Sequence, residues 1–152
     1  FICIVPENRN EITTEGGLDL KKNKNKIKKI ISQFKKKKIR TSLFINPNIK
    51  DIYLSKEIGA DCIEIHTGHF SNLVKSKKSS IKEFQQIKKC AILASKIGLE
   101  VHAGHGLDYK STKLLTKINE IVEFNIGHFI IGESIFYGLS SVIKKFKRII
   151  KN

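Results

Sequence analysis

Three short sequences combine glycine with histidine, the side chain best suited to proton transfer near neutral pH. Ala-Gly-His-Gly occupies residues 103–106, His-Thr-Gly residues 66–68 and Asn-Ile-Gly-His residues 125–128. Glycine beside a functional group lets the backbone approach a ligand closely and exposes amide N–H groups. His105 is therefore a candidate general acid or base, although a glycine turn around a hydrogen-bonded structural histidine has the same sequence.

Gly127 and His128 are candidates for holding a phosphate group. In β/α barrels, the loops after the last two strands often bind phosphate through backbone amides and a helix N-terminus. The alternative is a glycine that is needed only for close packing at the end of a strand.

The polar segment 6–17 and the acidic residue Glu64 complete the candidate site. Segment 6–17 contains two threonines and two glycines, a composition typical of an active-site lid and also of an ordinary exposed loop. Glu64 interrupts an apolar strand, where a carboxylate is costly unless it is paired or functional. A buried structural ion pair is the alternative for this residue.

A metal site is not expected. His102 and His105 are three residues apart, and Glu64, His66 and His128 could lie nearby. In a continuous strand, however, a side-chain period of two directs His102 and His105 to opposite faces. The three cysteines also lack the spacing of metal ligands, and we interpret them as buried thiols in a reducing compartment.

Apolar, β-rich runs alternate with helical patterns five times along the chain. This alternation predicts an α/β fold with parallel strands, either a doubly wound sheet or part of a (β/α)8 barrel. Periodicity alone leaves both architectures open, but in both of them ligands bind at the carboxyl ends of the strands. The expected strands are residues 1–5, 41–45, 62–65, 99–103 and 124–131.

Helical patterns fill the segments between these runs. In the best-marked helix, Ser80 and Glu83 form a predicted capping box and Gly98 stands where a helix C-terminal glycine belongs. Other helices are expected over residues 20–38, 48–58, 110–118 and from about residue 140 onward.

Charge and hydropathy indicate whether the chain binds nucleic acid or a membrane. The formal net charge is +15, but lysines fill the polar face of an amphipathic helix over residues 20–38, and aromatic residues are not interleaved with them as base-stacking platforms require. We therefore expect no nucleic-acid partner. No apolar stretch approaches the roughly 18–20 residues that cross a bilayer, so we expect no membrane partner.

Five linked sequences resemble the signature of pyridoxine 5′-phosphate synthases, in that family's order and nearly its spacing. The resemblance runs from Phe1 to the end of the chain. It implies a single domain over residues 1–152 that corresponds to strands four to eight of a TIM-type (β/α)8 barrel. The matching segments are residues 5–19, 42–45, 63–68, 103–107 and 125–128.

The family's reaction is what the resemblance implies for function. Members condense 3-amino-2-oxopropyl phosphate with 1-deoxy-D-xylulose 5-phosphate to give pyridoxine 5′-phosphate, phosphate and water, with no metal or organic cofactor. The resemblance therefore implies a cytoplasmic, ring-forming enzyme that assembles as a homo-oligomer and binds phosphorylated small molecules.

The resemblance also implies a role for each candidate residue. His105 matches the family's proton donor, and Glu64 an acidic residue that faces the site. Thr13 matches a lid threonine that contacts the sugar phosphate. Three residues match those that hold the phosphate of the amino-ketone substrate: Gly106, Gly127 and His128.

Two departures and one absence qualify the match. The family usually has Asn at the position of His102, and Cys or Arg at the position of His69. Its Asp-His at strand one, its basic residues after strand two and its glutamate at strand three have no counterpart here, so we expect a fragment that is inactive alone. The rival hypotheses are another phosphate-binding barrel enzyme, a non-catalytic remnant, and a basic nucleic-acid-binding domain.

Overall fold

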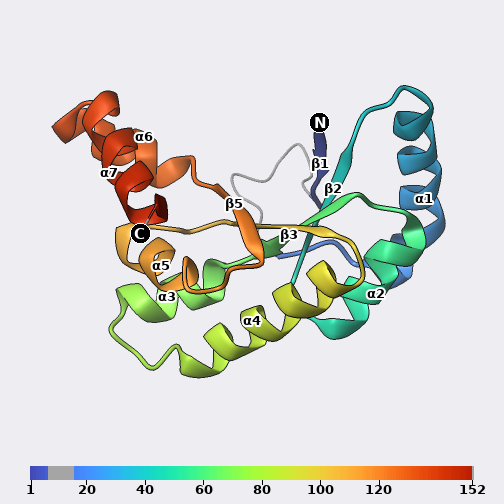
Figure 1. The fold of residues 1–152 in the computed structure, drawn as a ribbon, viewed down its shortest axis with the longest axis horizontal. Helices are drawn as coiled ribbons and strands as arrows, with labels where there is room; N and C mark the ends of the chain where they lie inside the picture. The colour runs from blue at the N-terminus through green and yellow to red at the C-terminus, as the bar shows by residue number, and fades with distance from the viewer. Residues whose placement is uncertain (7–15, 152) are drawn as a thin grey trace.

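The computed structural model describes residues 1–6 and 16–151, which form five strands and seven helices (Figure 1). In chain order the elements are β1 (Ile2–Ile4), α1 (Leu20–Lys36), β2 (Thr41–Ile45), α2 (Ile49–Ile58), β3 (Cys62–His66), α3 (Gly68–Lys75), α4 (Ile81–Lys96), β4 (Glu100–Gly104), α5 (Tyr109–Leu115), β5 (Ile121–Asn125), α6 (His128–Tyr137) and α7 (Leu139–Lys151).

The strands form one parallel sheet whose spatial order, β1-β2-β3-β4-β5, is also the chain order. Each strand therefore pairs with the next one, and the helical crossovers wind in a single direction. A doubly wound sheet reverses direction and has helices on both faces. The sequential order decides between the two predicted architectures: the fold is α/β, of the TIM-barrel type.

The two faces of the sheet differ in chemistry because side chains alternate along each strand. One face is apolar and packs against the helices, including Ile27 and Ile31 of α1 and Ile87 of α4. Its core residues from the three central strands are Leu43, Ile45, Ile63, Ile65, Val101 and Ala103.

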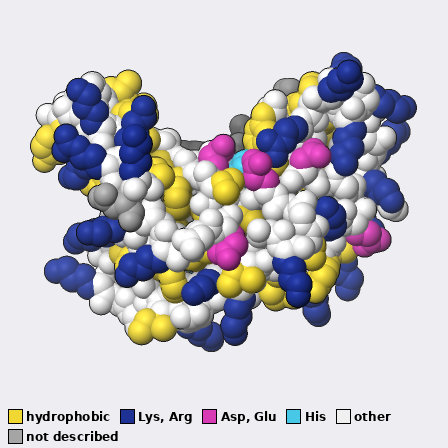
Figure 2. All heavy atoms as spheres, in the orientation of Figure 1, with side chains coloured by type: hydrophobic (Ala, Val, Ile, Leu, Met, Phe, Trp, Pro, Cys, Tyr) yellow, Lys and Arg dark blue, Asp and Glu magenta, His cyan; other side chains and the backbone are white. Residues whose placement is uncertain are grey.

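The opposite face is largely polar and corresponds to the interior of a barrel. Strand register places Glu64 beside His102, and His102 beside Glu123. Figure 2 shows the molecule hollowed between its α1 side and its α6–α7 side, with acidic side chains and a histidine exposed in the hollow. Burying the apolar face under helices thus leaves the polar face available for chemistry.

Most predicted elements are confirmed, and the last strand is the main error. Residues 124–131 were expected to be a strand, whereas β5 ends at Asn125 and α6 begins at His128. The apolar residues after Gly127 are helical, because a run of Phe and Ile fits a strand and a helix equally well without tertiary context. The prediction also missed the eight-residue helix α3.

Helix caps were predicted with mixed success. Gly98 has φ +75°, the left-handed conformation expected of a glycine just beyond a helix. Ser80 makes no capping hydrogen bond to α4, so the Ser80–Glu83 capping box is wrong. The capping box that the structure shows is on α5, where Asp108 accepts from the backbone N–H of Ser111 at 2.7 Å and the Ser111 hydroxyl accepts in return at 2.9 Å.

Among the described residues, no helix is both long and apolar enough to cross a membrane. The cysteines lie where the sequence placed them, Cys3 and Cys62 in strands and Cys90 in a helix, and all three are free thiols.

Replacing Ile63 by Ala tests whether the apolar face dominates stability. Ile63 is fully buried between the sheet and the helices, so we expect the free energy of unfolding to fall by about 2–5 kcal/mol in urea denaturation. Val122→Ala in β5 is the control, because Val122 is 66% exposed and its loss should change stability by less than about 0.5 kcal/mol. Equal effects would contradict the assignment of the two faces.

Candidate active site

The candidate site lies at the carboxyl ends of β3, β4 and β5. His66 is the last residue of β3, His105 follows the last residue of β4, and Asn125 ends β5. Register pairs His66 with Gly104, and Gly104 with Asn125. Parallel strands therefore bring the three sequences singled out above to one edge of the sheet.

A strained turn presents His105. Its backbone φ is +79°, a value that residues other than glycine rarely adopt. Gly106 follows with φ +72°. The Thr67 hydroxyl lies 2.7 Å from the carbonyl oxygen of Gly104 and 2.8 Å from that of His105. The Thr67 backbone N–H also donates to Gly104 at 2.8 Å. Thr67 thus holds the turn in a conformation that costs on the order of 1 kcal/mol or more.

The imidazole rings of His66 and His105 lie against each other, with their centroids 4.7 Å apart. Phe44 of β2 packs edge-on against His66 at 5.2 Å. A Cβ atom on Gly68 would lie 2.8 Å from Cδ2 of His105 and 2.9 Å from Nε2 of His66. Glycine at residue 68 is therefore what allows the two rings to pack at the start of α3.

Both rings favour the neutral form. Burial, and secondarily the charge of a protonated His105, lowers the pKa of His66 to about 4. Burial and the nearby Lys75 lower the pKa of His105. Nε2 of His66 is buried and has no hydrogen-bond partner among the described residues. The pair thus offers neutral imidazoles at pH 7, and His105 becomes a stronger acid than usual once it is protonated.

Glu64 lies deeper on the same face, in the middle of β3. Its Oε2 accepts a hydrogen bond from Nδ2 of Asn125 at 2.8 Å and a weaker one from Sγ of Cys3 at 3.6 Å. Gly104 provides the space for the carboxylate, because a Cβ atom there would clash with it. Burial raises the pKa of the Glu64 carboxyl, and the bonds from Asn125 and Cys3 oppose that rise. Glu64 is hydrogen-bonded, and none of the ion pairs found among the described residues includes it.

The N-terminus of α6 follows β5 directly. Gly127 is the N-cap residue and His128 the first helical residue, and both are exposed. Within residues 16–151, no side chain caps this helix. Free N–H groups at a helix start attract anions, so this position suits a phosphate. His128 is therefore at the start of a helix, whereas the sequence was read as placing it within a strand.

The predicted lid is described only at its two ends. Thr13 lies outside the described residues, so the structure does not test its role. At the far end, the N–H of Gly17 donates to Oδ1 of Asn46 at 3.0 Å and the N–H of Leu18 donates to the carbonyl of Phe44 at 2.8 Å. A Cβ atom on Gly17 would clash with the Ile45–Asn46 backbone. These contacts anchor the segment to the carboxyl end of β2, beside the candidate site.

His102 belongs elsewhere. Its ring is 1% exposed and contacts Glu100 and Glu123, whereas the His105 ring lies against His66. The two histidines therefore do not converge on one site, but the strand period gave the wrong reason for this. It predicted opposite faces, whereas β4 ends at Gly104 and the turn at His105 brings both rings to the same face of the sheet.

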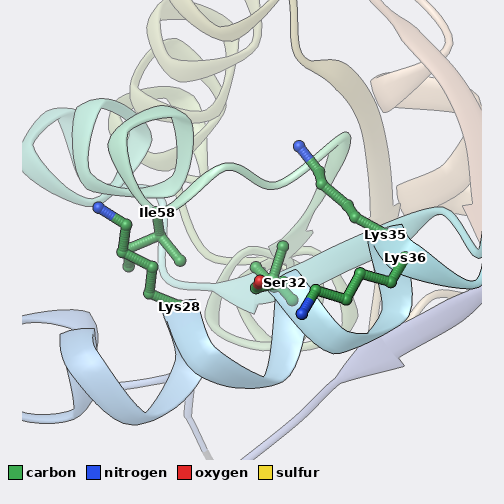
Figure 3. Close-up of a pocket in the computed structure, with 6 residues that line it drawn as sticks. Lys28, Ser32, Lys35, Lys36 and Ile58 are labelled. Atoms are coloured by element: carbon green, nitrogen blue, oxygen red, sulfur yellow. The ribbon is translucent and has the colours of Figure 1, made fainter.

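A pocket of about 430 Å³ lies on the outer surface, between α1 and the end of α2, and contains none of the candidate residues (Figure 3). Figure 3 shows the long side chains of Lys28, Lys35 and Lys36 around it, with Ser32 and Ile58 between them. A lysine-lined surface depression of this kind is typical of a solvated helix face.

Comparison with known proteins identifies the family. A family model described as "Pyridoxal phosphate biosynthesis protein PdxJ" matches residues 1–152. The chain belongs to the PdxJ family. This assignment confirms the resemblance deduced from the five sequence motifs, and PdxJ proteins are TIM barrels, as the sheet order indicates.

Curated relatives of this PdxJ-family chain are named pyridoxine 5′-phosphate synthase. A relative from Pelagibacter ubique is 65% identical over 149 residues, covering 98% of this chain and 62% of that protein. Relatives from Sulfurihydrogenibium and Aliarcobacter butzleri are 48% and 44% identical, covering 99% and 98% of this chain and 61% and 66% of their own lengths. The chain thus spans about three fifths of the length of the relatives it matches.

The structure adds residues that sequence reasoning did not assign to the site. His66, Thr67 and Gly68 were noted as a motif, but their packing against the His105 turn was not anticipated. Asn125 was likewise not connected with Glu64. The motifs themselves were the available signal; the contacts depend on strand register, which a single sequence does not reveal.

An NMR titration of the histidine ring protons tests the half-buried His66–His105 pair. We expect His66 to titrate near pH 4 and His105 below the ordinary value of 6.5. Because the unfolded chain binds a proton at His66 near pH 6.5 and the folded chain only near pH 4, the free energy of unfolding should fall as the pH drops through that window. A His66 signal titrating near 6.5 would contradict the burial of its ring.

Gly68→Ala tests whether the two imidazole rings need the space that a Cβ atom at residue 68 would fill. We expect shifted ring signals for both His66 and His105 and a net loss of about 0–2 kcal/mol of stability, since overpacking outweighs the better helix propensity of alanine. Gly132→Ala in α6 is the matched control, because no described atom outside the helix's own neighbouring backbone lies within 4 Å of its Cβ position. Unchanged ring signals in Gly68→Ala would refute the packing argument.

Proposed function

We propose that this chain is the part of a pyridoxine 5′-phosphate synthase that carries its proton donor and one of its two phosphate sites. The substrates would be 3-amino-2-oxopropyl phosphate and 1-deoxy-D-xylulose 5-phosphate, and the products pyridoxine 5′-phosphate, phosphate and water. The supporting observation is the convergence of His66–His105, Glu64 and an uncapped helix start at one sheet edge, in a chain whose relatives bear that enzyme's name.

The chemistry of ring closure calls for the groups that lie here. Joining an amino ketone to a ketose requires a Schiff base, repeated proton transfers and the loss of water and phosphate. His105 would donate the protons, since its lowered pKa makes the protonated ring a stronger acid than an ordinary imidazolium. Glu64, held by Asn125, would stabilise positive charge that develops on the condensing nitrogen or carbon.

The phosphate of the amino ketone would lie between two backbone segments. Gly106 is exposed at the His105 turn, and Gly127 and His128 begin α6 from the neighbouring strand. Their N–H groups and the positive end of the helix dipole favour a dianion. Pinning the phosphate there would hold the amino ketone beside His105, so that condensation proceeds within one complex. Thr13, in the lid, would contact the sugar phosphate.

The five strands would be strands four to eight of a closed barrel. Five strands do not close a barrel, and the relatives are longer than this chain. The remaining barrel units would contribute further proton-transfer groups. For the whole protein we propose a cytoplasmic homo-oligomer that needs no cofactor, with the exposed lysines forming a solvated surface and no nucleic-acid site.

Phosphate release from the two substrates tests the proposal. The assay uses this chain joined to the remaining segment of its Pelagibacter ubique relative, so that all eight strands are present. We expect release with the native sequence and a loss of about 10²–10⁴-fold in His105→Asn.

His69→Asn is the matched control. His69 is exposed and pairs with Glu83 of α4, 3.3 Å away, so its loss should leave phosphate release unchanged. If the folded protein releases no phosphate from these substrates but acts on a different sugar phosphate, the rival barrel enzyme is the correct assignment.

A further inference from the structure

A second cluster of chemically active side chains lies at the opposite end of the strands from His105. Cys62 and Glu100 are the first residues of β3 and β4, and His102 is two residues further along β4. The thiol sulfur, one carboxylate oxygen and one ring nitrogen all lie within 4.8 Å of one another. We propose that Cys62, Glu100 and His102 bind a thiophilic divalent cation, of which Zn²⁺ is the natural example.

The distances between the ligand atoms fit one small ion. Nε2 of His102 is 2.9 Å from Oε1 of Glu100, and Sγ of Cys62 is 3.8 Å from the same oxygen. In tetrahedral zinc sites with bonds of about 2.0–2.3 Å, ligand atoms are about 3.2–3.8 Å apart. Two of the three separations are thus within a few tenths of an ångström of these values, and the third, from the thiol sulfur to the ring nitrogen, is at most 4.8 Å, so the side chains must adjust around the ion.

The ligand types select the class of metal. Thiolate and imidazole are preferred by zinc and similar transition metals, whereas magnesium and calcium prefer oxygen ligands alone. Cys62 is fully buried and His102 is 1% exposed, so both donors are fixed by the fold before any ion arrives. Three protein ligands leave a fourth position for water or another residue.

The surrounding residues orient these ligands as metal sites require. Nδ1 of His102 is buried without a hydrogen-bond partner among the described residues, and Oε1 of Glu123 lies 3.5 Å away. A small approach of this carboxylate would fix the imidazole with Nε2 directed at the ion. Arg40 binds Oε2 of Glu100 at 2.9 Å, which leaves Oε1 directed at the other ligands.

Arg40 also supplies charge to the cluster. Its Nη2 lies 3.1 Å from Sγ of Cys62 and favours the thiolate there. With Cys62 ionised, the thiolate and the carboxylates of Glu100 and Glu123 carry three negative charges. Arg40 and a divalent ion supply three positive ones, so the occupied cluster is neutral.

The position of the cluster indicates a structural role. It lies at the amino ends of β3 and β4, whereas the chemistry proposed for this fold is at the carboxyl ends. An ion there would link β3 to β4 directly, β5 through Glu123 and the start of β2 through Arg40. Spacing along the chain does not predict this cluster, because Cys62 lacks metal-type spacing and the three residues meet only through strand pairing.

Cobalt titration of the metal-free 152-residue chain tests the site. Co²⁺ bound to a thiolate gives a charge-transfer band in the near ultraviolet. The double variant Cys3→Ser/Cys90→Ser leaves Cys62 as the single cysteine of the sequence, so a band in that variant can come only from Cys62. We expect the band there, its displacement by Zn²⁺, and a higher Tm of this variant with Zn²⁺ than without it.

Two further variants separate ligands from supporting residues. In the same background, His102→Asn removes a ligand and should abolish the band. Glu123→Gln leaves all three ligands in place and should weaken Co²⁺ binding by about 10–100-fold. A folded double variant with no thiolate–cobalt band and no Zn²⁺-dependent Tm overturns the proposal, and the cluster is then an ion-pair network in which Arg40 is the cation.

Discussion

The alternation of side chains along five parallel strands determines on which face of the sheet the chemically active strand residues lie. Because alternate residues face opposite ways, Ile63 and Ile65 are buried under helices while Glu64 and His66 project from the other face. Because the strands are parallel, all their carboxyl ends meet at one edge and all their amino ends at the other. The His66–His105 pair and the Cys62 cluster are therefore on the same face of the sheet, at its two ends.

The candidate site also requires two glycines, because other side chains pack into the space that a Cβ atom would fill at these residues. Residue 68 has no Cβ where the two imidazoles meet, and residue 104 has none where the Glu64 carboxylate lies. A polar group in a closely packed region is stable only if it has hydrogen-bond partners. Asn125 donates a hydrogen bond to Glu64, and the Thr67 hydroxyl bonds the carbonyl groups of the His105 turn. The Nε2 atom of His66 is an exception to this rule, because it is buried without a hydrogen-bond partner in the described part of the chain.

Sequence reasoning identified the elements that have strong local signals. The strand at residues 41–45 was predicted with its exact bounds, since a β-rich run between helices has few alternatives. Residues 124–131 were assigned wrongly because Gly127 starts a helix there, and the apolar residues that follow suit either structure. Helix α3 was missed because eight residues give too short a pattern to show a helical period.

The sequence indicates which residues are candidates for the site, but it does not indicate which of them contact one another. Strand-end position identified His105, and its turn conformation with φ +79° agrees with the flanking glycines. The contact of Glu64 with Asn125 joins residues 61 apart and depends on the stagger of three strands. The Cys62 cluster depends on the same register, so neither arrangement could be read from spacing along the chain.

The buried carboxylate of Glu64 has a consequence for molecular evolution. Burial makes its ionised form unfavourable, so an amide or apolar side chain at residue 64 would serve the fold at least as well. On the proposed function, catalysis and not folding is what retains the acid at residue 64, whereas Ile63 and Ile65 are retained by the fold. Replacement of this glutamate in a related sequence would then mark a protein in which that catalytic requirement has been lost.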